Sequence, residues 1–349
     1  TIWQTVLVKL QKCCCDAMIW VSDEEWMPNK HLDHLEDSIL TGRRVALGAV
    51  KQALSLTDNI SIKYDGAPAI VFGTNPENDK FFVGTKSVFN KRLIKINYSH
   101  EDIDKNHQGI VADILRLAFD NVPRINRIVQ ADWIGVGGGS VYCPNIVRYR
   151  FATKITKEII LAPHTEYTAV GPDVVGKPIS KELINSLNTL SDNIESSYFI
   201  DTTAAKAVKC PFNGLDILAK VVALLPFTKI PSSKKARVEI AKHINWFVRD
   251  DSWDYEFPSS DYMYDLLDAK YKREVNVNTF KVWQLIHQLK MRVLNTIQTD
   301  GSVICDIKGK SINHEGFVTV ADTQYKLVDR LTFSRANFNL DKDWTHEKV

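Results

Sequence analysis

Hydrophobic residues recur at three- and four-residue steps in two long parts of the chain, and this spacing predicts amphipathic helices. In residues 1–58, periodic apolar positions precede a polar break at residues 57–59. A second periodic part runs from 177 to 299. We therefore expect an N-terminal helical segment and a helical insertion. The periodic positions are Val45, Leu47, Val50 and Leu54, then Val238, Ile240, Ile244 and Phe247, and finally Val282, Ile286, Leu289, Val293 and Ile297.

Short runs of β-branched and aromatic residues, separated by Gly, Pro and Asn, predict strands outside these helical parts. We expect an α+β fold of antiparallel sheets, in which residues 59–176 and 300–349 form one domain interrupted by the insertion. The strand-like runs lie at 60–63, 69–72, 81–83, 128–134, 159–161, 302–307, 316–320 and 325–328.

Two further features favour structural roles. The glycine-rich stretch 135–140 has no following lysine and helix start of the kind that a phosphate loop needs, so we expect a hairpin there. Trp246, Trp253 and Trp283 lie within helical patterns, and large aromatic residues in such positions are typical of a core.

Composition narrows the class of protein. The 349 residues are 44% hydrophobic and 25% charged with a formal charge of +2, which fits a folded protein and excludes a chain that is basic throughout. The six cysteines lack the paired spacing of a zinc site or a disulfide framework, so we expect reduced thiols in the cytoplasm. Lys9 and Lys12 interrupt the apolar start of the chain, which argues against a signal peptide and a spanning helix. The cysteines are Cys13, Cys14, Cys15, Cys143, Cys210 and Cys305.

Candidate chemistry begins at the end of the first predicted strand, where residues 62–66 read Ile-Lys-Tyr-Asp-Gly. This short motif also occurs by chance. Further polar groups follow it at strand ends and in a fixed order: Lys86 in a Gly-Thr-Lys-Ser run, Asp132 in Gln-Ala-Asp-Trp, Glu315 before Gly-Phe-Val, and Lys326 in Tyr-Lys-Leu-Val.

This series resembles the nucleotidyl motifs of the superfamily that contains ATP-dependent DNA ligases, RNA ligases and mRNA-capping guanylyltransferases. The resemblance covers about residues 60–167 and 302–330. It implies an ATP-grasp-like nucleotidyltransferase fold and an ATP-dependent polynucleotide ligase that joins 5′-phosphate and 3′-hydroxyl ends through a lysyl-AMP intermediate. ATP and Mg²⁺ are the implied cofactors, and nucleic acid is the implied partner of a monomer.

The resemblance also implies residue roles. Lys63 would be the nucleophile, Ile62, Asp65 and Gly66 would shape the nucleotide site beside it, and Asp132 would hold the ribose. Glu315 would help to bind the metal ion, and Lys326 and Lys86 would neutralise charge on the phosphates. His164 lies in the region where the family has a purine-stacking strand, but we expect a structural histidine there.

Departures from the family pattern leave the substrate open between DNA and RNA. Pro68 stands where DNA ligases and capping enzymes have arginine, Asp132 stands where glutamate is usual, and Gln324 stands where a first lysine is expected. We expect no C-terminal oligonucleotide-binding barrel, so basic residues of the insertion are candidates for contacts to phosphates. These are Lys229, Lys234, Lys235, Arg237, Lys242, Lys270, Lys272 and Arg273.

Two other functions fit the same residues. A capping-type guanylyltransferase would use Lys63 with GTP, and a non-catalytic nucleic-acid-binding protein would keep the fold without the chemistry.

Overall fold

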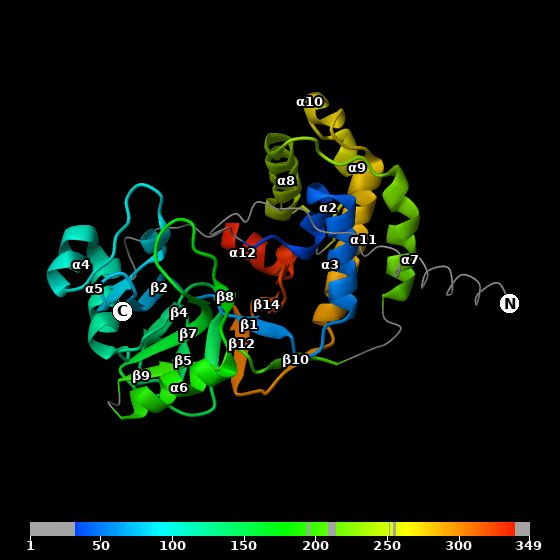
Figure 1. Cartoon of the computed structure of the whole chain (residues 1–349). Helices are drawn as coiled ribbons and strands as arrows, with labels where there is room; N and C mark the ends of the chain where they lie inside the picture. The colour runs from blue at the N-terminus through cyan, green and yellow to red at the C-terminus, as the bar shows by residue number, and fades with distance from the viewer. Residues whose placement is uncertain (1–31, 194–195, 209–213, 251, 254–255, 339–349) are drawn as a thin grey trace.

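The protein contains four β-sheets and a group of helices (Figure 1). The computed structural model describes residues 32–193, 196–208, 214–250, 252–253 and 256–338. The protein is a mixed α+β protein with mainly antiparallel sheets, as expected. None of the described sheets closes into a barrel.

The largest sheet has the strand order β3-β2-β4-β7-β8, and β9 pairs in parallel with β7. Alternation along β2 places Ile70 and Phe72 on one face and Val71 on the other. The strands are β2 (Ala69–Asn75), β3 (Lys80–Gly84), β4 (Ile128–Val136), β7 (Ile159–Tyr167), β8 (Lys177–Pro178) and β9 (Ser197–Phe199).

One face of this sheet packs against two helices, α5 (Gly109–Asn121) and α6 (Lys181–Asp192), with α4 (His100–Asn106) beside α5. On β4, Ala131 and Trp133 belong to this packed face. Since side chains alternate along a strand, Gln130 and Asp132 lie on the opposite face, which is free of these helices.

A small sheet with the order β1-β14-β15 carries the two ends of the predicted nucleotidyl series. Its strands are β1 (Ile60–Lys63), β14 (Gly316–Thr319) and β15 (Lys326–Leu327), and His34 forms an isolated bridge to Lys326. Residues 64–68 lead directly from β1 into β2 of the large sheet. The two sheets therefore meet at the lysine motif.

Two further sheets complete the β structure. One has the order β13-β12-β6-β5, and the other pairs β10 with β11. Their strands are β5 (Val141–Tyr142), β6 (Arg148–Phe151), β10 (Ala205–Ala207), β11 (Ile297–Thr299), β12 (Val303–Ile307) and β13 (Lys310–Ile312).

The prediction of a hairpin at residues 135–140 was wrong. The flanking strands β4 and β5 belong to different sheets. The stretch is a crossing between them, held by backbone hydrogen bonds from Gly137 to Glu158 (2.9 Å) and from Gly138 to Ile155 (2.8 Å). A Cβ at Gly137 would clash with the Lys157 carbonyl, which explains one of the glycines.

The remaining helices gather on one side of the molecule around α11 (Figure 1). Their shared core includes Val50, Ile240, Phe247, Trp283 and Leu289. The helices are η1 (Leu35–Asp37), α2 (Ser38–Thr41), α3 (Arg43–Leu54), α7 (Leu215–Leu224), η3 (Leu225–Phe227), α8 (Lys234–Arg249), α9 (Ser260–Asp265), α10 (Ala269–Lys272), α11 (Val277–Leu294), η4 (Arg330–Ser334) and α12 (Arg335–Phe338), and η2 (Lys86–Phe89) follows β3 on the other side.

The periodic positions in α3, α8 and α11 are confirmed as helical, with one exception. Ile297 lies in β11, because α11 ends at Leu294. Trp283 is fully buried as expected and Trp253 is half-buried, but Trp246 is 49% exposed, so the core position expected for it was wrong. The apolar stripe of α8 runs through Ile240, Ile244 and Phe247, and Trp246 projects beside it.

Some expectations concern residues outside the described part of the chain, including Lys9, Lys12, Cys13, Cys14, Cys15 and Cys210. Among the described residues, the exposed Cys143 and the buried Cys305 lie outside any disulfide. None of the described helices combines the length and apolar character needed to cross a membrane. The division of the chain into three units stays a prediction. Within the predicted insertion, β8 and β9 are strands of the large sheet and α6 packs on its face.

Candidate functional site

Lys63 and Glu315 contact each other at the ends of two paired strands. Lys63 lies opposite Gly316 in the antiparallel register of β1 and β14. Its Nζ donates a hydrogen bond to Oε2 of Glu315, and the two groups form an ion pair. The Lys63 side chain is 28% exposed and that of Glu315 is 8% exposed. The amine is therefore accessible to a small substrate, while its partner is mostly covered.

Both members of this pair have shifted pKa values. Burial lowers the pKa of Lys63, but the charges of Glu315, Asp132 and Asp65 outweigh it and raise the pKa above the ordinary value. Burial raises the pKa of Glu315 to about 7, an effect that Lys63 opposes and the two aspartates strengthen. Unless a further positive charge enters the site, these carboxylates keep the Lys63 amine protonated.

Gly66 brings the lysine motif against β4 at Asp132. A Cβ on Gly66 would lie 2.5 Å from the carbonyl oxygen of Trp133 and 2.8 Å from Cβ of Asp132. Ala67 also donates a backbone hydrogen bond of 3.1 Å to Trp133. Close packing of two chain segments is therefore the reason for a glycine at this position. This packing joins the two sheets beside Lys63.

Asp65 links two segments of the chain next to Lys63. Its carboxylate accepts hydrogen bonds from the Asn145 side chain (2.9 Å) and the Ile146 backbone N–H (3.0 Å). Its own N–H donates to the Tyr149 hydroxyl at 2.5 Å. The Asp65 carboxylate is thus committed to the loop between β5 and β6, and it acts on Lys63 through its charge.

Ile62 is also tied to its surroundings. Its side chain is buried, and its backbone N–H donates a 2.7 Å hydrogen bond to the Thr202 carbonyl. The Thr202 hydroxyl in turn donates to the Pro163 carbonyl at 2.6 Å. This chain of contacts links β1 to the end of β7.

Two further lysines lie within electrostatic range of the pair. Lys326 is half-buried on β15, and its N–H donates to the Asp33 carbonyl at 2.9 Å. Burial lowers the pKa of Lys326, and the charges of Lys63 and Lys86 lower it further. Lys86 itself is exposed at the start of η2. The site therefore holds the positive groups Lys63, Lys326 and Lys86 together with the carboxylates of Glu315, Asp132 and Asp65. An anionic substrate would be attracted by the three lysines.

Polar side chains next to Asp132 form a chain of hydrogen bonds that sequence reasoning missed. The Tyr167 hydroxyl donates to Oε1 of Gln130 (2.7 Å), and Nε2 of Gln130 lies 3.3 Å from Nε2 of His164. Nδ1 of His164 contacts the Thr165 hydroxyl at 2.7 Å, and its Nε2 lies 3.7 Å from Asp132. The alternation of β4 and β7 carried a signal for this arrangement, because Gln130 and Asp132 are two residues apart.

The turn that presents Glu315 is held by a buried thiol and imidazole. Sγ of Cys305 lies 3.4 Å from Nδ1 of His314, and both residues are buried. Burial raises the pKa of Cys305 to about 12 and lowers that of His314 to about 4, so both groups are neutral. His314 has a φ of 58°, in the left-handed region, and its ring packs edge-on against Tyr64. No sequence signal pointed to this pair.

A metal ion at this site would have few protein ligands. In the described residues, no group of three or more His, Cys, Asp or Glu side chains could hold one. Mg²⁺ is often bound through one or two carboxylates together with substrate phosphates. Glu315, a buried carboxylate that already pairs with a cation, would fit this type of site.

The structure thus brings Lys63, Asp132, Glu315, Lys326 and Lys86 into one charged site, and gives Asp65, Gly66 and Ile62 supporting contacts. No curated protein and no solved structure matches the chain. A family model described as a family of unknown function (DUF6267) matches residues 29–342. The chain belongs to that family.

Proposed function

We propose that the protein is an ATP-dependent polynucleotide ligase with a nucleotidyltransferase, ATP-grasp-like fold. The observation that carries the proposal is the contact between Lys63 and Glu315 where β1 and β14 end. Its support is the surrounding charge: Asp132 on the large sheet acts on Lys63, and Lys326 interacts with Lys63, Glu315 and Lys86.

The proposed reaction starts at the Lys63 amine. After losing its proton, Nζ attacks the α-phosphorus of ATP, an N–P bond forms, and the bond to the leaving pyrophosphate breaks. A 5′-phosphate oxygen of a nucleic-acid end then displaces Lys63 from the AMP. Finally, a 3′-hydroxyl attacks the activated phosphate and AMP leaves.

Glu315 controls the charge of the nucleophile in this proposal. Its carboxylate keeps Lys63 protonated when the site holds no other cation. The magnesium ion that accompanies ATP supplies positive charge at the phosphates. Glu315 would hold that ion, and its charge would then no longer raise the pKa of Lys63 as strongly, so that burial would favour the neutral amine.

The other residues act on the nucleotide. Asp132 is 20% exposed, and it accepts hydrogen bonds from the ribose hydroxyls. Lys326 and Lys86 neutralise the charge that develops on the phosphates. The Gln130 and His164 side chains fix the surroundings of Asp132 through their contacts.

Labelling of the chain tests this proposal. The protein is incubated with magnesium and ATP or GTP labelled at the α-phosphate, denatured, and analysed for bound label. Labelling by ATP that is lost in Lys63→Ala supports the ligase. Labelling by GTP instead would point to capping chemistry, and no labelling by either nucleotide would contradict a catalytic role. Nicked duplexes with DNA or RNA strands then identify the substrate.

A further inference from the structure

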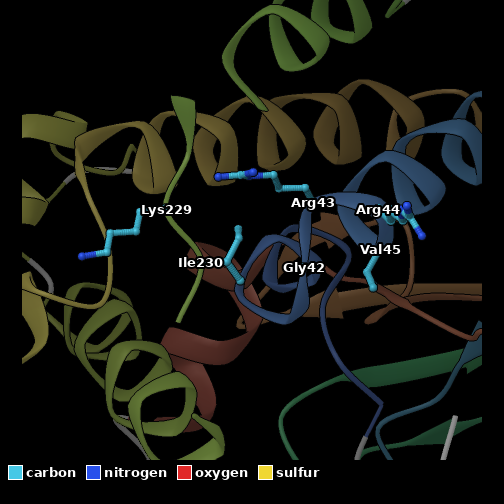
Figure 2. A pocket seen from close by; sticks show the side chains of 6 residues that line it. All are labelled: Gly42, Arg43, Arg44, Val45, Lys229 and Ile230. Carbon is cyan, nitrogen blue, oxygen red and sulfur yellow. The ribbon is translucent and has the colours of Figure 1, made fainter. Parts of the chain in front are cut away.

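A pocket of about 540 Å³ lies at the start of α3, away from the residues of the lysine site (Figure 2). Three of its six lining residues are cationic and none is acidic. Figure 2 shows Arg43 extending to the side on which Lys229 lies, whereas Arg44 points the opposite way. The lining residues are Gly42, Arg43, Arg44, Val45, Lys229 and Ile230.

Backbone carbonyls hold two of these cations without neutralising them. Nε and Nη2 of Arg43 both donate to the Thr228 carbonyl, at 2.9 and 2.6 Å. Nζ of Lys229 donates to the Arg273 carbonyl. A carbonyl fixes the direction of a charged group but leaves its net charge in place. These two charged groups are therefore positioned before any ligand arrives.

A fourth cation comes from α8. Nη1 of Arg237 lies 3.4 Å from the Thr41 hydroxyl, and its Nε is buried without a hydrogen-bond partner among the described residues. Neither Arg237 nor the three lining cations forms an ion pair within the described part of the chain. The Glu274 carboxylate already accepts two hydrogen bonds from Ser232, which lower its pKa, and the charge of Lys229 lowers it further.

Among the other basic residues of the insertion, Lys242 differs in this respect, because it pairs with Glu239 at 2.8 Å. Lys272 donates to the Asp265 carbonyl and keeps its net charge, but it does not line the pocket. From the sequence, Lys242, Lys272 and Lys229 were predicted as equal candidates for contacts to phosphates. In the fold, Lys229 alone of these three lysines lines the pocket, and Arg43 and Arg44 from the N-terminal helices line it too.

We propose that Arg43, Arg44, Lys229 and Arg237 bind the phosphodiester backbone of the nucleic-acid substrate. The four cations outnumber Glu274, the acidic group that interacts with Lys229, so they repel one another unless a further anion lies among them. Their spread over α3, the 229–230 segment and α8, together with the opposed directions of Arg43 and Arg44, suits successive phosphates of one strand better than a single anion. The choice of nucleic acid as the polyanion rests on the proposed ligase function.

Binding measured without ATP tests this surface separately from the lysine chemistry. A fluorescent nicked duplex is titrated with the full chain, and its anisotropy is followed at several salt concentrations. Arg44→Ala is the first variant, because Arg44 forms no hydrogen bond or ion pair with the described residues, so its loss removes none. Arg237→Ala is the second, and Lys242→Ala is the matched control from the same helix.

We expect each pocket variant to bind more weakly at low salt and to lower the slope of log affinity against log salt by about one, as the loss of one phosphate contact predicts. Lys242→Ala should retain the wild-type slope. Equal loss in all three variants, or unchanged slopes in both pocket variants, would overturn the proposal. The two proposals can fail separately. If ATP never labels the protein but the pocket variants still bind nucleic acid more weakly, the proposed binding surface is supported and the proposed ligase function is refuted.

Discussion

The amine of Lys63 donates a hydrogen bond to the carboxylate of Glu315, a residue 252 positions later in the chain. The pair is placed by the register of β1 and β14 and is surrounded by Asp132, Lys326 and Lys86. The carboxylate raises the pKa of the amine, so the charge state of Lys63 depends on that of Glu315.

Glu315→Gln should therefore change two properties of Lys63 in opposite directions. Without the carboxylate, the pKa of Lys63 falls, and each unit of decrease raises the neutral fraction about tenfold near neutral pH. Acetylation of Lys63, followed by mass spectrometry across a pH series, should have its midpoint at lower pH than in the wild type. Transfer of AMP from ATP should decrease, because the proposed metal ligand is lost. An unchanged acetylation midpoint would contradict the coupling.

Gly66→Ala should damage the junction of the two sheets. The new Cβ would meet the Trp133 carbonyl and Asp132, so the segment must move away from β4, at a cost of about 1–3 kcal/mol. Urea unfolding measures the loss. Gly48→Ala is the control, because nothing lies within 4 Å of its Cβ and alanine favours the helix α3. Equal unfolding free energies for Gly66→Ala and the wild type would refute the steric explanation.

Cys305→Val should expose the role of the thiol behind Glu315. Valine has a similar shape but cannot hydrogen-bond, so Nδ1 of His314 is left buried without its partner, which costs about 1–3 kcal/mol. Cys305→Ser keeps a hydroxyl at the same place and should lose less. Thermal unfolding ranks the variants. If Cys305→Val and Cys305→Ser unfolded at the same temperature, the hydrogen bond would have no effect on stability.

Glu36→Gln should strongly destabilise the fold. Glu36 and Lys290 are fully buried and joined at 2.7 Å, and Arg330 contacts the same carboxylate at 3.3 Å. Removing the anion leaves buried cations only partly compensated by Asp37, which typically costs about 3–5 kcal/mol. The exposed pair of Lys242 and Glu239 provides the control, since Glu239→Gln should cost about 0–1 kcal/mol. Similar losses in both variants would contradict the importance of burial.

Local sequence patterns predicted the strands that carry the site. β1 was expected at residues 60–63 and lies at Ile60–Lys63, because β-branched residues alternate there and end at a turn. α4 and α5 were not predicted, although Ile114, Leu115 and Ala118 have helical spacing and pack on the large sheet. The position of Trp246 also followed from the α8 stripe and was overlooked.

Tertiary contacts could not be predicted in this way. The approach of Gly66 to β4, the thiol behind His314 and the cations around Arg43 join residues that are far apart in the chain. Only the resemblance to nucleotidyltransferases linked Lys63 with Glu315 in advance, because no local property of either strand specifies its partner.

The most direct test of the central claim is to locate a covalent nucleotide on the chain. The protein is incubated with ATP and magnesium, digested, and its peptides are analysed by mass spectrometry. The proposal predicts one AMP on Lys63, none in Lys63→Ala, and release of this AMP when a nicked duplex is added. Absence of the adduct, or an adduct on another residue that persists in Lys63→Ala, would contradict it.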